Sequence, residues 1–380
     1  MPPLRRHTRR PASRGSVLSD EGVVDYLVRR KLVTAADAIN GTLTVRNVSR
    51  RNHVIAITRE SGDSYLLKQG IGQDRISTIR NEAWAYETIA RESGEFAGYL
   101  PRYGGYDSAK HILAVQFVKD GENLWNYCTK HRRFPASVGA ELGRVLGVLH
   151  RTTKGRSRPA PRASNPRRIP WVFSETRPPA RVLWTSSAGR IQLLELLQRF
   201  RQFRRHFDRL CREWKTESFT HFDLRWDNCI VVSGAEGLNG RIGLKIVDWE
   251  MARRGDPRWD VGAVFSNFLS FWVSSIPITG DCPPDRYLHA AEMPLERLQP
   301  AIRAFWASYK REMGISEGAS GEWLLRAVEY AACQLVQTAA EHAQDTTGLT
   351  GGAICLLQLC LNILRHPRKA TTELLGIAAA

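Results

Sequence analysis

One stretch of the chain contains the three polar side chains that phosphoryl transfer requires. Residues 221–250 contain Asp223, then Asn228 five residues later, and then Asp248. A carboxylate can orient an attacking hydroxyl group, while a carboxamide and a second carboxylate can hold Mg²⁺ on the phosphates of a nucleotide. Taken singly, such residues are more often solvated turn residues. The hypothesis therefore depends on their spacing and on the elements around them.

Two short apolar runs indicate how these residues could meet. Residues 229–232 and 244–247 each read as a strand, and a loop with several glycines joins them. Two strands joined in this way form a β-hairpin, which places the end of one strand beside the start of the other. We therefore expect Asp223, Asn228 and Asp248 to converge at one edge of the hairpin.

A lysine and a glutamate earlier in the chain could complete a nucleotide site. Lys68 closes a strand-like run, and Glu82 lies within residues 76–92, where apolar residues recur at helical spacing. A strand lysine that pairs with a glutamate of the next helix can be aimed at nucleotide phosphates. A surface lysine and a surface glutamate are an equally good interpretation of this pair alone, because no glycine-rich GxGxxG loop precedes it.

The remaining patterns predict an α+β chain with a small antiparallel β-rich N-lobe and a larger, mainly helical C-lobe. Short apolar runs alternate with polar turns up to residue 118, and apolar residues mostly recur at helical spacing beyond it. The expected domains are a basic disordered arm over 1–15, an N-lobe over 16–118 and a C-lobe over 119–380. Strands are expected at 41–45, 53–58, 64–68 and 111–118, helices at 19–32, 76–92, 137–152, 190–215, 261–272, 322–343 and 353–365, and an irregular segment at 273–300.

The net charge of +17 is concentrated in three segments. Residues 1–15 contain five arginines and no acid, residues 151–181 contain nine basic residues and one glutamate, and residues 190–215 contain eight basic residues and three acids. The prolines within 155–181 predict a long basic loop there. A charge excess this local favours an anionic partner. Nucleic acid is the usual one, but the chain has no recognition-helix, zinc-finger or aromatic RNP pattern.

The composition fits a globular protein of the cytoplasm. Hydrophobic residues make up 43% of the chain and charged residues 24%, and no apolar run approaches the roughly 20 residues of a membrane span. The first residues are basic but lack the apolar segment of a signal peptide. The seven cysteines include no CxxC pair, which favours a reducing compartment and argues against a zinc site.

Taken together, these features resemble the aminoglycoside phosphotransferase and choline kinase superfamily, which has a two-lobed protein-kinase-like fold. The matching segments read HFDLRWDN, IVDWE and GDPRWDVG, and Lys68 and Glu82 match in order and spacing. The resemblance covers about residues 40–275. One position departs from the pattern, because the family usually has glycine where this chain has Phe222.

The resemblance implies roles for five residues, four of which lie in residues 221–250, which we call the catalytic stretch. Asp223 would be the catalytic base, Asn228 a magnesium ligand and Asp248 the principal magnesium ligand. His221 would be structural, and Asp260 would brace the catalytic loop, residues 221–228, by hydrogen bonding. These roles imply Mg²⁺ as a cofactor.

The resemblance also implies ATP as the phosphoryl donor. Lys68 would hold the nucleotide phosphates, and Glu82 would orient the lysine. The backbone from Gln116 to Val118 would hold the adenine. The polar turn at 47–52 would cover the phosphates without a glycine-rich sequence, as is common in the superfamily.

The favoured acceptor follows from charge and from motif wording. Basic segments beside the acceptor site would repel a cationic aminoglycoside, so an acidic peptide or an anionic small molecule fits better. One branch of the superfamily resembles this chain in its DLRWDN and VDWE wording. That branch phosphorylates Ser or Thr of ribosomally made precursor peptides, as in lanthipeptide-like biosynthesis, before a partner lyase eliminates the phosphate. The acceptor would then contact Arg201, Arg204 and Arg205.

Three alternatives stay open. The first is a small-molecule O-phosphotransferase of the aminoglycoside or choline type. The second is a pseudokinase, a binding subunit that keeps the fold without turnover. The third is a nucleic-acid-binding protein that uses the basic segments, which no motif supports.

Overall fold

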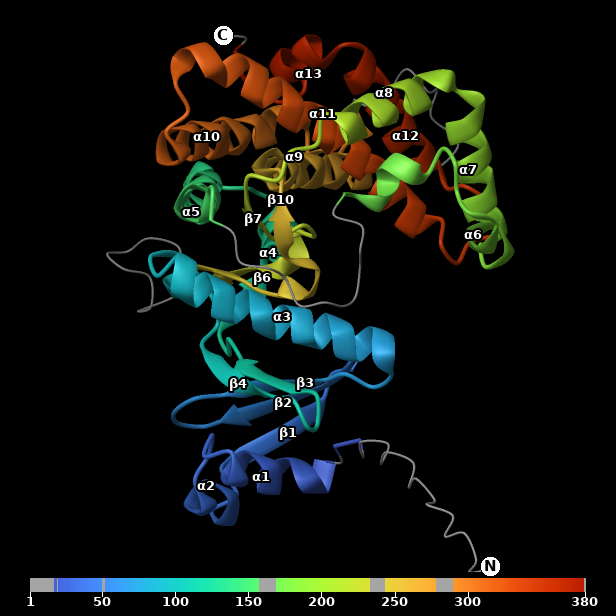
Figure 1. Ribbon diagram of the computed structural model, residues 1–380. Helices are drawn as coiled ribbons and strands as arrows, with labels where there is room; N and C mark the ends of the chain where they lie inside the picture. Colours follow the sequence, from blue (N-terminus) through green and yellow to red (C-terminus); the bar gives the residue numbers. More distant parts are fainter. Residues whose placement is uncertain are drawn as a thin grey trace, which may run out of the picture. The chain divides into compact units, whose positions relative to one another are not determined.

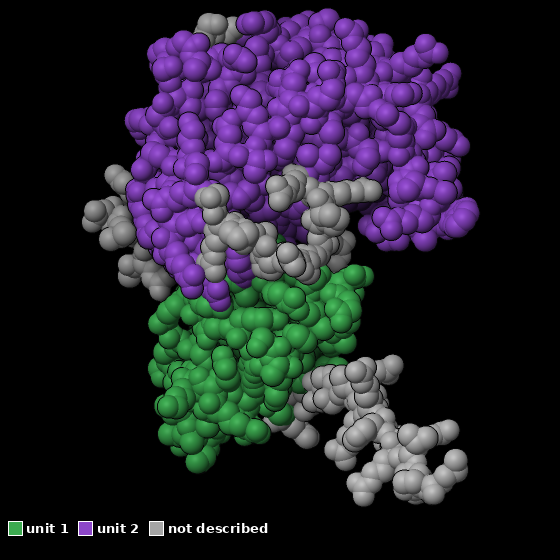
Figure 2. All heavy atoms as spheres, viewed as in Figure 1, with its two compact units in different colours: residues 1–83, 102–119 green, residues 84–101, 120–380 purple. Residues whose placement is uncertain are grey.

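The computed structural model describes residues 17–18, 20–49, 52–156, 169–232, 243–277 and 290–378. The chain divides into two compact units, which Figure 2 colours separately. Unit 1 comprises residues 1–83 and 102–119, and unit 2 comprises residues 84–101 and 120–380. Unit 1 ends at residue 119, one residue beyond the expected lobe boundary at 118. Residues 84–101 were expected in the N-lobe but belong to unit 2. The basic arm at 1–15 lies outside the described residues, as do residues 157–168 of the basic loop predicted at 155–181.

Unit 1 is built on one antiparallel sheet of five strands in the order β1-β2-β3-β5-β4 (Figure 1). Each of the four predicted strands is present, with its ends shifted by at most two residues. The strand β4 was not predicted, because its sequence YGGYD is poor in apolar residues and its register shifts between Tyr103 and Gly105. The bounds are β1 Leu43–Asn47, β2 His53–Arg59, β3 Tyr65–Gln69, β4 Tyr103–Asp107 and β5 Ile112–Gln116.

The core of unit 1 lies between this sheet and the helix α1 (Asp20–Arg29). Val23 and Leu27 of α1 are fully buried against Ile57 and Leu67 of the sheet. The short helix α2 (Ala35–Ile39) follows, capped by Thr34. Because successive side chains of a strand face opposite sides of a sheet, burial of Leu67 against α1 turns the next residue, Lys68, to the other side.

Unit 2 is mainly helical (Figure 1). The helix α3 (Gln73–Glu92) begins in unit 1 and ends in unit 2. The other helices of unit 2 are α4 Leu124–His131, α5 Ala136–Thr153, α6 Ala180–Trp184, α7 Ala188–Arg199, α8 Arg201–Arg212, α9 Pro257–Ser274, α10 Leu295–Met313, α11 Glu317–His342, α12 Gly351–Arg365 and α13 Pro367–Glu373.

Two small sheets in unit 2 hold the catalytic stretch. The strands β6 (Gly121–Asn123), β8 (Cys229–Val232) and β9 (Gly243–Ile246) pair in the order β6-β8-β9. The strands β7 (Ser218–Thr220) and β10 (Arg253–Gly255) form an antiparallel pair. Among the described residues, short turns of 3₁₀ helix lie at η1 Phe96–Tyr99, η2 Trp171–Ser174, η3 Trp226–Asn228 and η5 Trp249–Met251.

Three predicted features of the C-lobe differ from the structure. The described end of the basic loop predicted at 155–181 contains the 3₁₀ turn η2 and the start of α6. The helix expected at 190–215 is two helices, α7 and α8, because Phe200 has an extended backbone (φ −94°, ψ 96°) that breaks the hydrogen-bond ladder. The segment expected to be irregular up to residue 300 contains the start of α10, which continues through Pro300. Among the described residues no helix is long and apolar enough to cross a membrane.

Candidate active site

The predicted hairpin is formed by β8 and β9. The two strands are antiparallel, with Cys229 opposite Ile246, and the backbone N–H of Val247 donates to the carbonyl oxygen of Asn228 at 2.9 Å. Asn228 therefore lies at the entry to β8 beside the exit from β9, where Asp248 follows. The connecting loop, residues 233–242, lies outside the described residues.

The asparagine is also tied to the aspartate that precedes it. The side-chain amide of Asn228 donates to the backbone carbonyl of Asp223 at 2.9 Å. Asn228 is the last residue of the turn η3, whose buried Trp226 packs against the rings of Phe134 and Phe268, each 4.9 Å away between centroids. This aromatic packing fixes the turn, so the structure brings Asp223 and Asn228 together as the sequence predicts.

Asp260 makes the contacts that a loop-bracing residue needs. It lies in the first turn of α9, is fully buried, and accepts the backbone N–H groups of His221 at 2.7 Å and Phe222 at 3.0 Å. The ring Nε2 of His221 in turn donates to the carbonyl of Val247 at 2.9 Å. One buried carboxylate and one imidazole thus connect the backbone before Asp223 to the backbone before Asp248.

Phe222 and Asp248 both adopt left-handed backbone conformations, with φ of 73° and 65°. Only glycine enters this region without steric cost, which explains in physical terms why glycine suits the position of Phe222. Strained non-glycine residues cluster at functional sites. The two sharp turns fix the backbone of Asp248 and of the residue before Asp223.

The ring of Phe222 packs in an aromatic cluster. The indole rings of Trp214 and Trp259 lie 6.1 and 5.9 Å from it, and the guanidinium of Arg253 lies 4.0 Å from its centroid. Burial lowers the pKa of Arg253 to about 10. The indole N–H of Trp259 donates to the carbonyl oxygen of Phe222 at 3.1 Å. The sequence shows that Phe222 departs from the family pattern, but it does not show that the backbone there is left-handed.

The nucleotide half of the predicted site lies in unit 1. The ammonium group of Lys68 donates to both carboxylate oxygens of Glu82 at 2.9 Å, and Glu82 is only 1% exposed. A buried ion pair with this geometry differs from two solvated surface charges, the alternative interpretation of this pair. At the end of β5 the N–H of Gln116 donates to the carbonyl of Arg102 at 2.8 Å. The contact of Gln116 and Val118 with adenine stays a prediction.

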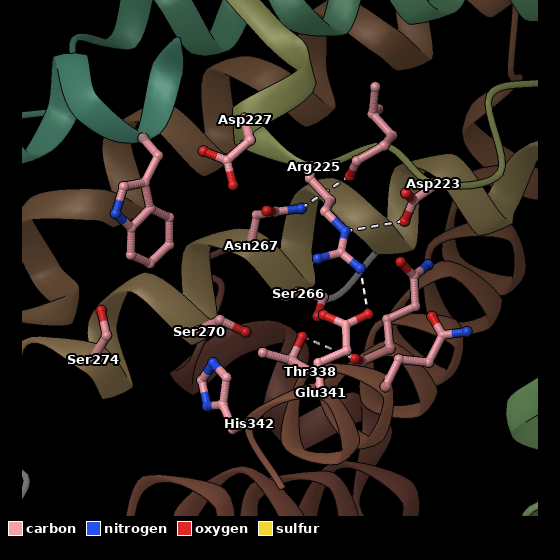
Figure 3. Close-up of a pocket in the computed structure, with 14 residues that line it drawn as sticks. Asp223, Arg225, Asp227, Ser266, Asn267, Ser270, Ser274, Thr338, Glu341 and His342 are labelled. Carbon is pink, nitrogen blue, oxygen red and sulfur yellow. Dashed lines mark hydrogen bonds and ion pairs between the residues drawn. The ribbon is translucent and has the colours of Figure 1, made fainter. Parts of the chain in front are cut away.

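A cavity of about 260 Å³ opens beside Asp223 within unit 2 (Figure 3). Its walls come from α9, α11, the catalytic loop and Trp125 of α4. The sequence signals only Asp223 among these residues, because the others are isolated positions on helices or in the loop. The lining residues are Trp125, Asp223, Leu224, Arg225, Asp227, Ser266, Asn267, Ser270, Ser274, Gln334, Gln337, Thr338, Glu341 and His342.

The charge of this lining differs from the basic wall that we expected. It contains three carboxylates, from Asp223, Asp227 and Glu341, and one guanidinium, from Arg225. Burial acts to lower the pKa of Arg225, but Asp223 and Glu341 outweigh burial and raise that pKa above its ordinary value. The cavity is therefore acidic overall.

The predicted acceptor contacts lie elsewhere. Arg201, Arg204 and Arg205 are exposed on α8 and do not line the cavity. Their part in acceptor binding stays a prediction.

The donor set of the catalytic stretch fits Mg²⁺. The side chains of Asn228 and Asp248 offer a carboxamide oxygen and carboxylate oxygens, which are the hard ligands that Mg²⁺ prefers. Within the described ranges no group of three or more His, Cys, Asp or Glu residues could hold a metal ion. Mg²⁺ is commonly held by one or two protein ligands together with substrate phosphates and water, so the pair is sufficient.

Comparison with solved structures confirms the kinase-like α+β fold. A glucosamine kinase in complex with glucosamine, ADP and inorganic phosphate superimposes with a TM-score of 0.56 at 13% identity, over 94% of this chain and 88% of that one. A microcompartment-associated aminopropanol kinase gives a TM-score of 0.52 at 15% identity, over 95% of this chain and 100% of that one. At such identities the likeness concerns the fold alone.

The family is shown by sequence. No curated protein matches this chain. The phosphotransferase enzyme family, however, matches residues 44–305, which include Lys68, Glu82 and the whole catalytic stretch. This match confirms the expectation of a phosphotransferase. The chain belongs to the phosphotransferase enzyme family.

Proposed function

We propose that this protein transfers the terminal phosphate of ATP, with Mg²⁺, to a hydroxyl group of a small amine-bearing alcohol. The observation that supports this proposal is the acidic cavity beside Asp223 (Figure 3). Ligand cavities usually measure about 300–1,000 Å³, so a volume of about 260 Å³ suits a compact molecule.

The side chains divide the chemistry among them. Lys68, held by Glu82, would bind the nucleotide phosphates, and Asn228 and Asp248 would hold the metal ion. The ion would neutralise charge that develops on the phosphate oxygens. Asp223 would orient the acceptor hydroxyl and accept its proton as the new P–O bond forms. The bond between the terminal phosphorus and the bridging oxygen breaks, which releases ADP and the phosphorylated acceptor.

The polar lining supports an acceptor with an ammonium group and further hydroxyl groups. Three carboxylates face one guanidinium in the cavity, so a cation is attracted and an anion repelled. Serine hydroxyls from α9 and carboxamides from α11 can hydrogen-bond a polyol. Two proteins of similar fold are named as glucosamine kinase and aminopropanol kinase, and both names contain an amine-bearing alcohol.

A second candidate is transfer to Ser or Thr of an acidic precursor peptide. The observation that favours it is the exposed basic face of α8, with Arg201, Arg204 and Arg205. In that case the peptide backbone would lie outside the cavity and one hydroxyl-bearing side chain would enter it. A partner lyase would belong to this candidate alone.

The proposal is tested with labelled ATP, Mg²⁺ and three acceptor classes: amine-bearing alcohols such as glucosamine, neutral polyols, and acidic Ser-containing peptides. We expect transfer to the first class, and a loss of about 100- to 10,000-fold in kcat for Asp223→Asn and for Asp248→Asn. Asp345→Asn is the matched control, because this exposed residue lies outside the cavity lining.

Three outcomes would contradict the proposal. Transfer to the peptides alone would favour the second candidate. Binding of MgATP by the wild type without transfer to any class would indicate a pseudokinase. Near-normal turnover by Asp248→Asn would show that the assignment of Asp248 as a metal ligand is wrong.

A further inference from the structure

A bridge of three charged side chains joins the catalytic loop to the C-terminal part of α11. The Nε of Arg225 donates to Oδ1 of Asp223 at 3.0 Å, and its Nη2 donates to Oε1 of Glu341 (Figure 3). Asp223 and Arg225 are two positions apart, whereas Glu341 is separated from Arg225 by 116 positions. Nε and Nη2 form one edge of the guanidinium, so the two donors of that edge are divided between two different elements.

The geometry of the guanidinium determines how many oxygens of Asp223 it covers. Arginine is a planar fork that tends to bind a carboxylate through two parallel hydrogen bonds. Here Glu341 takes the Nη2 of the edge that Nε and Nη2 form, so Asp223 receives a single hydrogen bond, through Nε, on one of its two oxygens. The second carboxylate oxygen of Asp223 is therefore not enclosed by the fork.

We propose that Glu341 is a positioning residue for the transfer reaction, which acts on the catalytic carboxylate Asp223 through the guanidinium of Arg225. By holding Nη2, Glu341 prevents Arg225 from closing on both oxygens of Asp223. The uncovered oxygen can then receive the acceptor hydroxyl. This inference rests on the proposed function, because it concerns how Asp223 is presented to the acceptor.

The same bridge distinguishes two carboxylates of the cavity. Glu341 is engaged with Arg225, whereas Asp227 makes no hydrogen bond or ion pair with the part of the chain that the structure describes. We therefore assign the ammonium group of the acceptor to Asp227 and the orientation of Asp223 to Glu341.

The bridge is a weak support for the fold, which makes it testable. The side chains of Arg225, Asp223 and Glu341 are 44%, 39% and 36% exposed, and ion pairs this exposed contribute little to stability. Glu341→Gln should therefore fold as the wild type does. Its effect on the reaction then reports on positioning and not on loss of structure.

The experiment compares Glu341→Gln with Asp227→Asn, using MgATP with glucosamine as the probe. We expect Glu341→Gln to lower kcat about 10- to 100-fold and to change the KM for glucosamine less than about threefold. Asp227→Asn should raise that KM at least about tenfold with little change in kcat, because it removes binding that is equal in ground state and transition state. Glu322→Gln, on an exposed position of the same helix, should change neither constant.

A double-mutant cycle tests the route through Arg225. Arg225→Met should itself lower kcat, and adding Glu341→Gln to it should change kcat less than about twofold. An undiminished effect of Glu341→Gln in the Arg225→Met background would overturn the inference. A raised KM for glucosamine with unchanged kcat in Glu341→Gln would also overturn it, because Glu341 would then contact the acceptor.

The cycle is repeated on the hydrolysis of MgATP, in which water replaces the acceptor. One outcome is that the wild type hydrolyses MgATP without phosphorylating glucosamine. If the double-mutant cycle on hydrolysis then shows the expected coupling between Arg225 and Glu341, the bridge is supported and the proposed acceptor class is wrong. Absence of both reactions in the wild type would remove the proposed function and the inference with it.

Discussion

Phe222 shows how a single residue can be both strained and well packed. A non-glycine residue with a φ of 73° costs about 1–2 kcal/mol relative to an ordinary conformation. The same residue packs its ring against Trp214 and Trp259 and under the guanidinium of Arg253. Burial of this ring offsets the backbone cost, so the turn before Asp223 is held by packing where a glycine would adopt it freely.

This balance predicts an unusual order of stability for substitutions. Phe222→Ala loses the ring and keeps the strain, whereas Phe222→Gly loses the ring and relieves the strain. We expect the glycine variant to be more stable than the alanine variant by about 1–2 kcal/mol, as measured by urea unfolding followed by tryptophan fluorescence. At the fully buried Phe219 in the strand β7, where φ is not positive, the order should be reversed. Equal stability of the two variants at residue 222 would contradict this account.

Sequence spacing identifies some site residues and necessarily misses others. Asn228 directly precedes the hairpin of β8 and β9, Asp248 follows it, and Asp223 lies five positions before Asn228, so their proximity follows from local pattern. Glu341 is different, because its partner lies 116 positions away and a lone glutamate near a helix end has no distinguishing signal. Only the packing of α11 beside α9 makes it part of the site.

At the scale of elements, the cavity depends on how closely α9 and α11 approach. A Cβ atom added to Gly262 of α9 would lie 2.8 Å from the carbonyl oxygen of Ala327 and 2.9 Å from the backbone nitrogen of Ala331, both on α11. These are backbone atoms, so they cannot move aside as a flexible side chain would. The glycine therefore sets the spacing of the two helices that supply most of the cavity wall.

Gly262→Ala should consequently affect both stability and acceptor binding. We expect it to destabilise unit 2 by about 1–3 kcal/mol through overpacking and to raise the KM for the acceptor by widening the helix spacing. The matched control is Gly321→Ala on α11, where an added Cβ meets nothing within 4 Å. That variant should be stabilised by about 0.4–1 kcal/mol, because alanine restricts the unfolded chain. A stabilised Gly262→Ala variant would show that the helices are not held at this distance.

Helices and strands whose apolar residues recur at regular spacing were predictable from the sequence. The ends of elements that depend on tertiary packing were not. The strands β1, β2, β3 and β5 follow from apolar runs between polar turns. The break at Phe200 does not, because the apolar face continues across it and only the extended backbone of that residue separates α7 from α8. Pro300 gives a misleading signal, since it is tolerated inside α10.

At the scale of the whole molecule, the charge of +17 and the acidic cavity have opposite signs. Nothing in composition alone could separate them, because the cavity takes its three carboxylates from the catalytic loop and from α11. The basic excess that the sequence reveals lies partly on α8, whose exposed arginines are outside the cavity. A cationic small acceptor and an anionic macromolecule can therefore be recognised by different surfaces of one protein.

This separation predicts that the two kinds of recognition respond independently to charge reversal. Combined Arg201→Glu, Arg204→Glu and Arg205→Glu should weaken binding of a glutamate-rich peptide at least about tenfold. Binding of this peptide to the wild type should itself weaken as salt rises, because exposed charges are screened beyond a Debye length of about 10 Å at 0.1 M. The kcat/KM for glucosamine should stay within about twofold, since the cavity is not altered.

The control is the same charge reversal at Arg365, Arg368 and Lys369, which are exposed near the C-terminal end. It distinguishes an effect of the basic face of α8 from an effect of net charge. If this control variant weakens binding of the peptide as strongly as the α8 variant does, the peptide is attracted by the total charge of the protein and not by α8. If instead the α8 variant loses glucosamine transfer, α8 takes part in the small-molecule site and the acidic cavity is not sufficient for the acceptor. Loss of peptide binding by the α8 variant alone would leave α8 as the docking face, and phosphate on the bound peptide would then make the second candidate the main activity.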